Sequence, residues 1–104
     1  MKLYMNSRRK TFDAIAAYDP IEKKFVVLKG SRVSNTISKA PTFRSVKTVE
    51  RLRSEYVKNN IVQVDVCFKS ASSAAYFVTG SSTDGMRAWK DEQGVILKDI
   101  VDKC

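Results

Sequence analysis

The sequence predicts an α+β domain that has one mostly antiparallel sheet and two helices, in the order ββαβαββ. Runs of β-forming residues are separated by short turns, and two segments carry apolar residues at helical spacing. The helices stand between hairpins instead of alternating regularly with single strands, which favours an α+β fold over a doubly wound α/β fold. The 104 residues suffice for a single domain with one hydrophobic core.

The first two predicted strands form a hairpin. Every second residue of the segment 12–18 is apolar or aromatic, as expected for a half-buried strand. Residues 24–29 are rich in β-forming side chains and end at a glycine. Between them, Asp19 and Pro20 begin a turn.

Residues 1–11 are expected to form a basic N-terminal arm, and residues 12–104 the single α+β domain. The arm is recognised by three consecutive basic residues, Arg8, Arg9 and Lys10.

A first helix is predicted from Arg44 or Ser45 to Asn59, after a Ser/Thr-rich connection over residues 30–43. Ser45 is a candidate N-cap, and asparagine suits the C-terminal end because it tolerates the left-handed conformation. The apolar residues at helical spacing are Val46, Val49, Leu52 and Tyr56.

A strand and a shorter helix are predicted to follow. Residues 61–68 alternate between apolar and polar side chains, which indicates a third strand. Ser70 is a good N-cap for a helix over residues 71–79, and Gly80 suits its C-terminal end.

The last two strands are predicted at residues 86–90 and 95–97, with a turn between them. Large apolar side chains on the predicted inner faces define the expected core. Among its members are Val27, Leu52, Val64, Val78 and Trp89.

The residues most useful for catalysis are missing. The chain contains no histidine and two cysteines, which removes the commonest general base, the Ser-His and Cys-His pairs, and most zinc sites. No phosphate-binding glycine loop or calcium loop occurs. We therefore expect no enzyme, no metal and no cofactor. Cys67 is expected to be a core or sheet residue and not a nucleophile.

The charge of the chain favours an anionic partner. Nineteen Lys and Arg stand against eleven Asp and Glu, for a net charge of +8. Residues 1–80 carry the whole excess, because residues 81–104 have four basic and five acidic residues. Such an excess favours nucleic acid or an anionic membrane surface. No apolar stretch approaches the ~20 residues that span a bilayer, and no signal peptide is recognised, so we expect a cytoplasmic protein that does not enter membranes.

The strongest binding pattern lies on the first predicted helix. At 100° per residue, four basic side chains cluster on the side away from the apolar residues. This stripe is expected to contact the phosphates of a nucleic acid, although a solvated face that also carries Glu50 and Glu55 is the competing interpretation. Its members are Arg44, Lys47, Arg51 and Lys58.

Two weaker patterns complete the candidate nucleic-acid-binding residues. Ser31 and Arg32 follow Gly30 at a strand end, where backbone N–H groups and a guanidinium suit an anion. Ser70 begins a helix, whose N-terminus favours anions, although simple capping is the alternative. Trp89 beside a lysine is either a base-stacking side chain or a core anchor.

Three segments of the chain resemble a known family. They are FVVLKGSRVS (25–34), FKSASSAAYFVTG (68–80) and DGMRAWKDEQGVILKDI (84–100). They resemble a bacterial domain of unknown function that is typically appended C-terminally to GIY-YIG nucleases and restriction–modification proteins, and which is similar to the RAMA domain. The typical pattern has Pro at the position of Ala71 and an aromatic residue at that of Met86.

The resemblance implies an accessory domain that helps a nuclease or a methylase to engage DNA. Together with the charge, it makes a nucleic-acid-binding module, for DNA in particular, the leading hypothesis. The alternative is a protein–protein interaction module that tethers or regulates such an enzyme. A small-molecule pocket at the start of the second helix is a third possibility.

Overall fold

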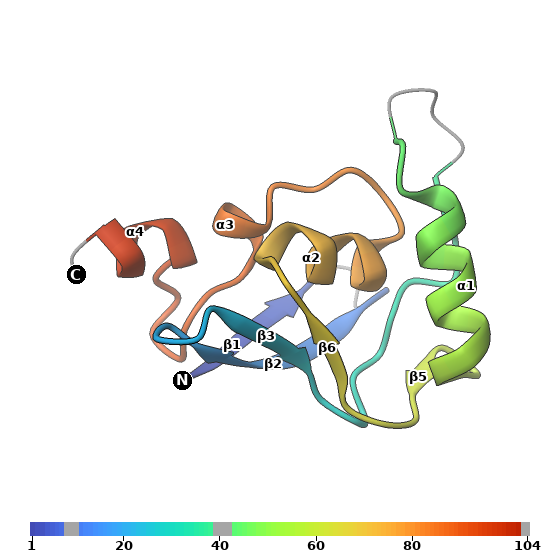
Figure 1. Ribbon diagram of the computed structural model, residues 1–104, viewed down its shortest axis with the longest axis horizontal. Helices are drawn as coiled ribbons and strands as arrows, with labels where there is room; N and C mark the ends of the chain where they lie inside the picture. Colours follow the sequence, from blue (N-terminus) through green and yellow to red (C-terminus); the bar gives the residue numbers. More distant parts are fainter. Residues whose placement is uncertain (8–10, 39–42, 103–104) are drawn as a thin grey trace.

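A helix-covered antiparallel sheet forms the centre of the protein (Figure 1). The computed structural model describes residues 1–7, 11–38 and 43–102. Its four-stranded sheet has the order β1-β2-β3-β6, all neighbours antiparallel. The strands are β1 (Lys2–Asn6), β2 (Asp13–Asp19), β3 (Lys24–Val27) and β6 (Val66–Phe68). The predicted α+β class with a mostly antiparallel sheet is confirmed.

Helices cover one face of this sheet. Helix α2 (Ala71–Thr79) lies across that face, and α1 (Val46–Tyr56) stands beside α2 at one end of the molecule (Figure 1). The remaining elements are the short strands β4 (Val57–Lys58) and β5 (Ile61–Val62) and the short helices α3 (Gly85–Ala88) and α4 (Leu97–Asp102). In the part of the chain described, no helix has the length and apolar character needed to cross a membrane.

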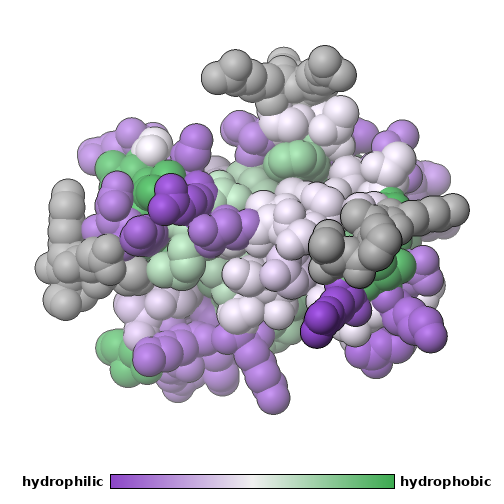
Figure 2. All heavy atoms as spheres, turned by 90° about the horizontal axis from the view of Figure 1, so that it is seen from above, coloured by the Kyte–Doolittle hydropathy of each residue, from purple (hydrophilic) through white to green (hydrophobic). Residues whose placement is uncertain are grey.

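The surface above α2 has an intermediate hydropathy. Seen from that side (Figure 2), pale, weakly polar residues occupy the middle, and strongly hydrophilic side chains gather toward both ends. The exposed and partly exposed residues of α2 and the loop after it are mostly Ser and Thr. In this view, the strongly hydrophilic side chains therefore lie mainly toward the ends of the molecule.

The prediction that residues 1–11 form an arm outside the domain is wrong for residues 2–6. These residues form β1, which pairs with β2 along its whole length, from Lys2–Ala17 to Asn6–Asp13. Leu3 and Met5 are buried, at 0% and 4% exposure. Residues 2–6 alternate between polar and apolar side chains, which is the pattern of a strand. The three basic residues at positions 8–10 dominate the composition of residues 1–11, and they led to the prediction of an arm. Arg8, Arg9 and Lys10 themselves lie outside the described residues.

The predicted strand over residues 61–68 is two short strands, β5 and β6, which belong to different sheets. The chain turns between them, and Val64 is 48% exposed, so its predicted burial is wrong. The Asp65 carboxylate accepts the backbone N–H of Lys29 (2.8 Å), which holds this turn against the end of β3.

Helix α1 ends earlier than predicted, because Val57 and Lys58 form β4. Asn59 and Asn60 both have positive φ, 53° and 65°. A two-residue hairpin turn with φ > 0 at both positions is the geometry that asparagine tolerates. The expected left-handed conformation at Asn59-Asn60 is thus present, but it joins β4 to β5 instead of ending the helix. Ser45 precedes α1 without a side-chain capping hydrogen bond.

A single segment links the two sheets. Arg32 exchanges backbone hydrogen bonds with Asp13 at the start of β2, 2.7 and 2.9 Å long. On its other side, Val62 of β5 donates to Ser31 O (2.8 Å), and Gly30 donates to Val62 O (2.9 Å). Residues 31–33 therefore lie between β2 and β5 and continue the pleated surface from β1 to β4.

The predicted strand over residues 86–90 is mostly helical, because α3 includes residues 86–88, and in the predicted strand over residues 95–97 only Leu97 is helical. Asp84 caps α3 through its side chain, which accepts the N–H of Met86 (3.1 Å). Two isolated bridges are all that remains of the extended structure: Lys90 pairs with Tyr4 at the edge of β1, and with Ile96. The predicted order ββαβαββ in a single sheet is therefore wrong at the C-terminus as well as at the N-terminus.

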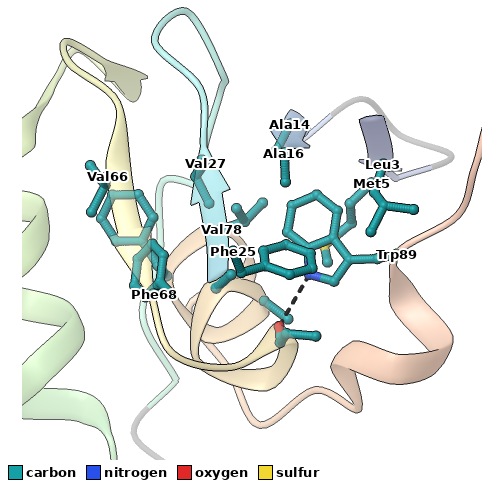
Figure 3. Packing of buried hydrophobic residues seen from close by; sticks show 14 of the residues in the cluster. Leu3, Met5, Ala14, Ala16, Phe25, Val27, Val66, Phe68, Val78 and Trp89 are labelled. Atoms are coloured by element: carbon teal, nitrogen blue, oxygen red, sulfur yellow. Dashed lines mark hydrogen bonds between the residues drawn. The ribbon is translucent and has the colours of Figure 1, made fainter. Parts of the chain in front are cut away.

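Trp89 anchors the core between the sheet and α2 (Figure 3). Its side chain is 0% exposed, its ring lies 5.0 Å from that of Phe25, and its indole N–H donates to Ala71 O (3.1 Å) at the start of α2. A Cβ at Gly85 would overlap with the backbone of Ala71, so α3 packs tightly against the same end of α2. The predicted burial of Val27, Val78 and Trp89 is confirmed, and Leu52 is partly buried.

Both predicted caps of α2 are confirmed. The Ser70 hydroxyl accepts the N–H of Ser73 (3.1 Å). Gly80 has φ 73°, and a Cβ there would overlap with the carbonyl oxygen of Thr36. Glycine is needed at this position both for its conformation and for the space that it leaves.

Arg53 joins α1 to the C-terminal end of α2. Its guanidinium donates to the carbonyl oxygens of Phe77 (3.0 Å) and Val78 (3.1 Å) in α2. It also donates to Ser34 O (2.8 Å), Ser34 Oγ (3.1 Å) and Thr36 O (3.2 Å) in the segment that precedes α1. Burial lowers the pKa of Arg53 to about 10, which leaves the side chain charged at neutral pH. A positive charge at the C-terminal end of a helix is also favoured by the helix dipole.

Replacing Trp89 with Ala should lower the free energy of unfolding by about 3–5 kcal/mol, because it empties a fully buried site and leaves Ala71 O without its donor. Urea unfolding followed by circular dichroism measures this loss. A loss below about 1 kcal/mol would be incompatible with a buried Trp89.

Replacing Arg53 with Leu should lower the free energy of unfolding by at least about 3 kcal/mol, because four carbonyl oxygens lose a charged donor. Arg51→Leu is the matched control on the same helix, and its exposed side chain should change the free energy of unfolding by less than about 0.5 kcal/mol. Equal losses in the two variants would contradict the role assigned to Arg53.

Candidate nucleic-acid interface

The packing of α1 decides which of its basic residues face solvent. Val49 is buried, and Leu52, Arg53 and Tyr56 are partly buried on the same side of the helix. Lys47 and Arg51 lie on the opposite side and are exposed. Glu50 and Glu55 are exposed as well.

The predicted stripe is only partly helical. Arg44 precedes α1, and Lys58 lies in β4, so the helical spacing that was assumed for four residues applies to Lys47 and Arg51 alone. All four side chains are exposed. Their use in binding nucleic acid stays a prediction.

Arg32 and Lys58 lie on the pleated surface that continues the sheet. The backbone pairs Asp13–Arg32, Arg32–Ile61 and Ile61–Lys58 are antiparallel, and opposite residues of such pairs point to the same face. Arg32 and Lys58 therefore share the face that Asp13 occupies, two strand spacings or about 10 Å apart. This is the face that α2 does not cover.

The charge asymmetry of the sequence is also an asymmetry in space. The described residues 29–38 and 43–58 carry seven Lys or Arg and two Glu. They form α1, β4 and the segment beside α1, which together make one end of the molecule, whereas α3 and α4 lie toward the other end (Figure 1). In the described part of the chain, side-chain ion pairs join Lys24 to Glu22 (3.2 Å) and Arg87 to Asp84 (3.4 Å), and none involves this basic end.

Ser31 is placed differently from the prediction. It is 4% exposed, and its hydroxyl both accepts the N–H of Ile15 (3.1 Å) and donates to Ile15 O (3.3 Å). The backbone N–H groups of Gly30 and Ser31 donate to Val62 O and Leu28 O. The expectation of free N–H groups at this strand end is wrong, because backbone carbonyl oxygens of the chain accept them. The exposed Arg32 side chain is what the segment offers to a ligand.

Ser70 is exposed, and its hydroxyl bonds to the backbone N–H and the hydroxyl of Ser73. Beside it, a surface hollow of about 200 Å³ lies at the start of α2, where a small-molecule pocket was the third possibility. Its lining includes Tyr18, Lys23, Lys69 and Met86.

The base-stacking interpretation of Trp89 is wrong, because the ring is enclosed by the core. The aromatic side chain on the uncovered face of the sheet is Tyr4, on the opposite side of β1 from the buried Leu3 and Met5. The alternating polarity of residues 2–6 was the sequence signal that could have placed Tyr4 on a strand. The prediction that residues 1–11 form an arm missed this signal.

A larger hollow adjoins Tyr4 on this uncovered face. Its volume is about 390 Å³, and it lies between β1 and the turn after Trp89. The Tyr4 hydroxyl donates to Glu92 Oε1 (3.4 Å). Burial and the Glu92 carboxylate both raise the pKa of Tyr4 above its ordinary value, so the hydroxyl is protonated at neutral pH. The lining residues are Tyr4, Asn6, Ala88, Lys90, Asp91, Glu92 and Gly94.

The fold and the site define a small α+β domain with one helix-covered and one uncovered sheet face, and with its positive charge concentrated at one end. The model of the family described as Domain of unknown function (DUF4357) matches residues 3–101, and the chain belongs to this family. No curated protein and no solved structure matches the chain.

The structure explains the segments by which the family was recognised. Ser70 and Gly80 cap α2, Gly85 allows the close approach of α3, and Trp89 anchors the core. Each of these residues serves the fold.

Cys67 lies in β6, as expected for a sheet residue, but its side chain is exposed on the uncovered face between the buried Val66 and Phe68. In a Cys104→Ser variant, a neutral maleimide should label Cys67 in the folded protein at a rate within about tenfold of that in the urea-unfolded chain, because nothing in the fold shields the thiol. Labelling that requires unfolding would show that this face is covered.

Proposed function

We propose that this domain is a nucleic-acid-binding accessory module, for DNA in particular, of the kind associated with restriction–modification or GIY-YIG nuclease proteins. The observation that carries the proposal is the basic end of the molecule, where five exposed cations lie without an ion-pair partner among the described residues. They are Arg32, Arg44, Lys47, Arg51 and Lys58.

Phosphate groups are the ligands that such a surface suits best. Exposed Lys and Arg that are not neutralised within the protein can release condensed counterions from a nucleic acid, which is a large part of its binding free energy. Lys47 and Arg51 extend from a helix, while Arg32 and Lys58 extend from a neighbouring pleated surface. The basic end therefore offers positive charges on two neighbouring surfaces, the exposed side of α1 and the pleated surface. A phosphate backbone that curves around this end can contact both.

The absence of histidine supports an accessory role instead of a catalytic one. The partner in this proposal is a nuclease or a methylase that supplies the chemistry. The relation to the RAMA domain, and to the proteins that carry such appendages, is part of the same proposal.

A second candidate function is protein–protein interaction. The observation that favours it is the mixed charge of the exposed face of α1, where Glu50 and Glu55 flank Lys47 and Arg51. A partner enzyme with a complementary pattern of charges would fit that face. Salt dependence separates the two candidates, because phosphate contacts give a linear dependence on the logarithm of the salt concentration.

The affinity for random duplex DNA should fall with salt with a slope of about −4, as expected for four or five phosphate contacts. The double variant Lys47→Glu/Arg51→Glu should bind all sequences more weakly and flatten the slope by roughly two units. Fluorescence anisotropy with a labelled duplex at several salt concentrations measures both effects.

The matched control is Lys23→Glu/Lys98→Glu, which makes the same change in net charge at exposed residues outside the basic end. It should retain most of the affinity at moderate salt. The proposal fails if duplex DNA does not bind at low salt, or if the two double variants weaken binding equally.

A further inference from the structure

The hollow beside Tyr4 is built from two segments that are far apart in the sequence. The bridge between Tyr4 and Lys90 has backbone hydrogen bonds of 2.7 and 3.0 Å, and it places the turn over residues 91–94 against the edge of β1. The Asp91 carboxylate accepts the N–H groups of Gln93 and Val95 (2.9 Å each), which shapes this turn. The wall of the hollow is thus held by the fold.

The side chains of the hollow include an aromatic ring, hydrogen-bonding groups and charged groups. Tyr4 contributes an aromatic ring, whose hydroxyl is tied to Glu92. The Asn6 side-chain amide and the Lys90 ammonium have no hydrogen-bond or ion-pair partner among the described residues. Beside the ring, the hollow therefore offers an amide that both donates and accepts, the positive charge of Lys90, and the two carboxylates of Glu92 and Asp91, of which Asp91 already accepts two backbone N–H groups.

We propose that this hollow binds a single unpaired nucleotide, with the base against the Tyr4 ring, its edge at Asn6 and Glu92, and its phosphate at Lys90. This proposal rests on the proposed nucleic-acid function. It specifies that the uncovered face binds single-stranded nucleic acid. Single-strand-binding proteins recognise bases in this manner, by stacking on aromatic side chains beside a basic groove. The volume of about 390 Å³ falls within the usual range of ligand sites.

The hollow is connected to the basic end along the pleated surface. Asn6 pairs with Asp13, Asp13 with Arg32, Arg32 with Ile61, and Ile61 with Lys58. These side chains share one face and span four strand spacings, about 19 Å in all. A strand whose unpaired base occupies the hollow can therefore reach Arg32 and Lys58 with its neighbouring phosphates.

Two measurements test the proposal on the full chain. The first is a titration of the ¹⁵N-labelled protein with each of the four deoxynucleoside 5′-monophosphates. We expect saturable shifts of the amide signals of Tyr4, Asn6 and residues 90–94. The second is the affinity for a fluorescein-labelled single-stranded octamer of thymidine.

In the second measurement, Tyr4→Ala should weaken binding by roughly 5- to 150-fold, which is the usual effect of losing one stacked base. Tyr4→Phe keeps the ring and should stay within about threefold of the original affinity. Asn6→Ala and Lys90→Ala should each weaken binding, whereas Lys98→Ala, the matched control on α4, should not. Because Asn6 and Lys90 are exposed, their variants test the site even if Tyr4→Ala is unstable.

The proposal is overturned if the monophosphates shift no signal around the hollow, or if the octamer binds Tyr4→Ala, Asn6→Ala and Lys90→Ala as it binds the original protein. Duplex binding that is sensitive to Lys47→Glu/Arg51→Glu would then leave the proposed function standing. If neither duplex nor single strand binds at low salt, both fail.

Discussion

The hydrogen bonds of Arg53 are the interaction on which the placement of the basic end depends. One guanidinium satisfies carbonyl oxygens at the end of α2 and in the segment that leads to α1, so three parts of the chain meet at a single charged group. Because Arg53 points inward, the helical geometry turns Lys47 and Arg51 outward. The close contact of Gly80 with Thr36 lies at the same junction, so the two features reinforce each other.

A second constraint is that helices cover only one face of the sheet. The buried side of each strand packs against α2 and Trp89, through residues such as Leu3, Ala16, Phe25 and Val27. The other side must remain compatible with water, and it carries polar side chains among small and medium-sized apolar ones. The same arrangement leaves a broad pleated surface free for a ligand, with Tyr4 near one end and Lys58 near the other.

Features with a local cause could be predicted from the sequence. Ser70 and Gly80 bound α2 as expected, the hairpin of β2 and β3 forms where the turn residues indicate it, and Asn59-Asn60 takes the left-handed conformation. Features with a distant cause could not. Residues 86–90 have the composition of a strand, but the Asp84 cap and the close packing of Gly85 on α2 make most of them helical. Val64 continues an alternating pattern, but the chain turns there because its two halves pair with different strands.

By itself, the sequence determined the α+β class, the excess of positive charge and its concentration before residue 81, and the lack of histidine chemistry, because these follow from composition and short-range periodicity. Only the tertiary structure decided which arginine serves the fold and which face solvent. Arg51 and Arg53 differ by two positions on one helix, and the carbonyl oxygens that select Arg53 come from residues 34–36 and 77–78. The hollow beside Tyr4 has the same origin, since β1 and the turn after Trp89 meet only when the sheet is complete. Such contacts between distant residues leave no periodic trace in the sequence.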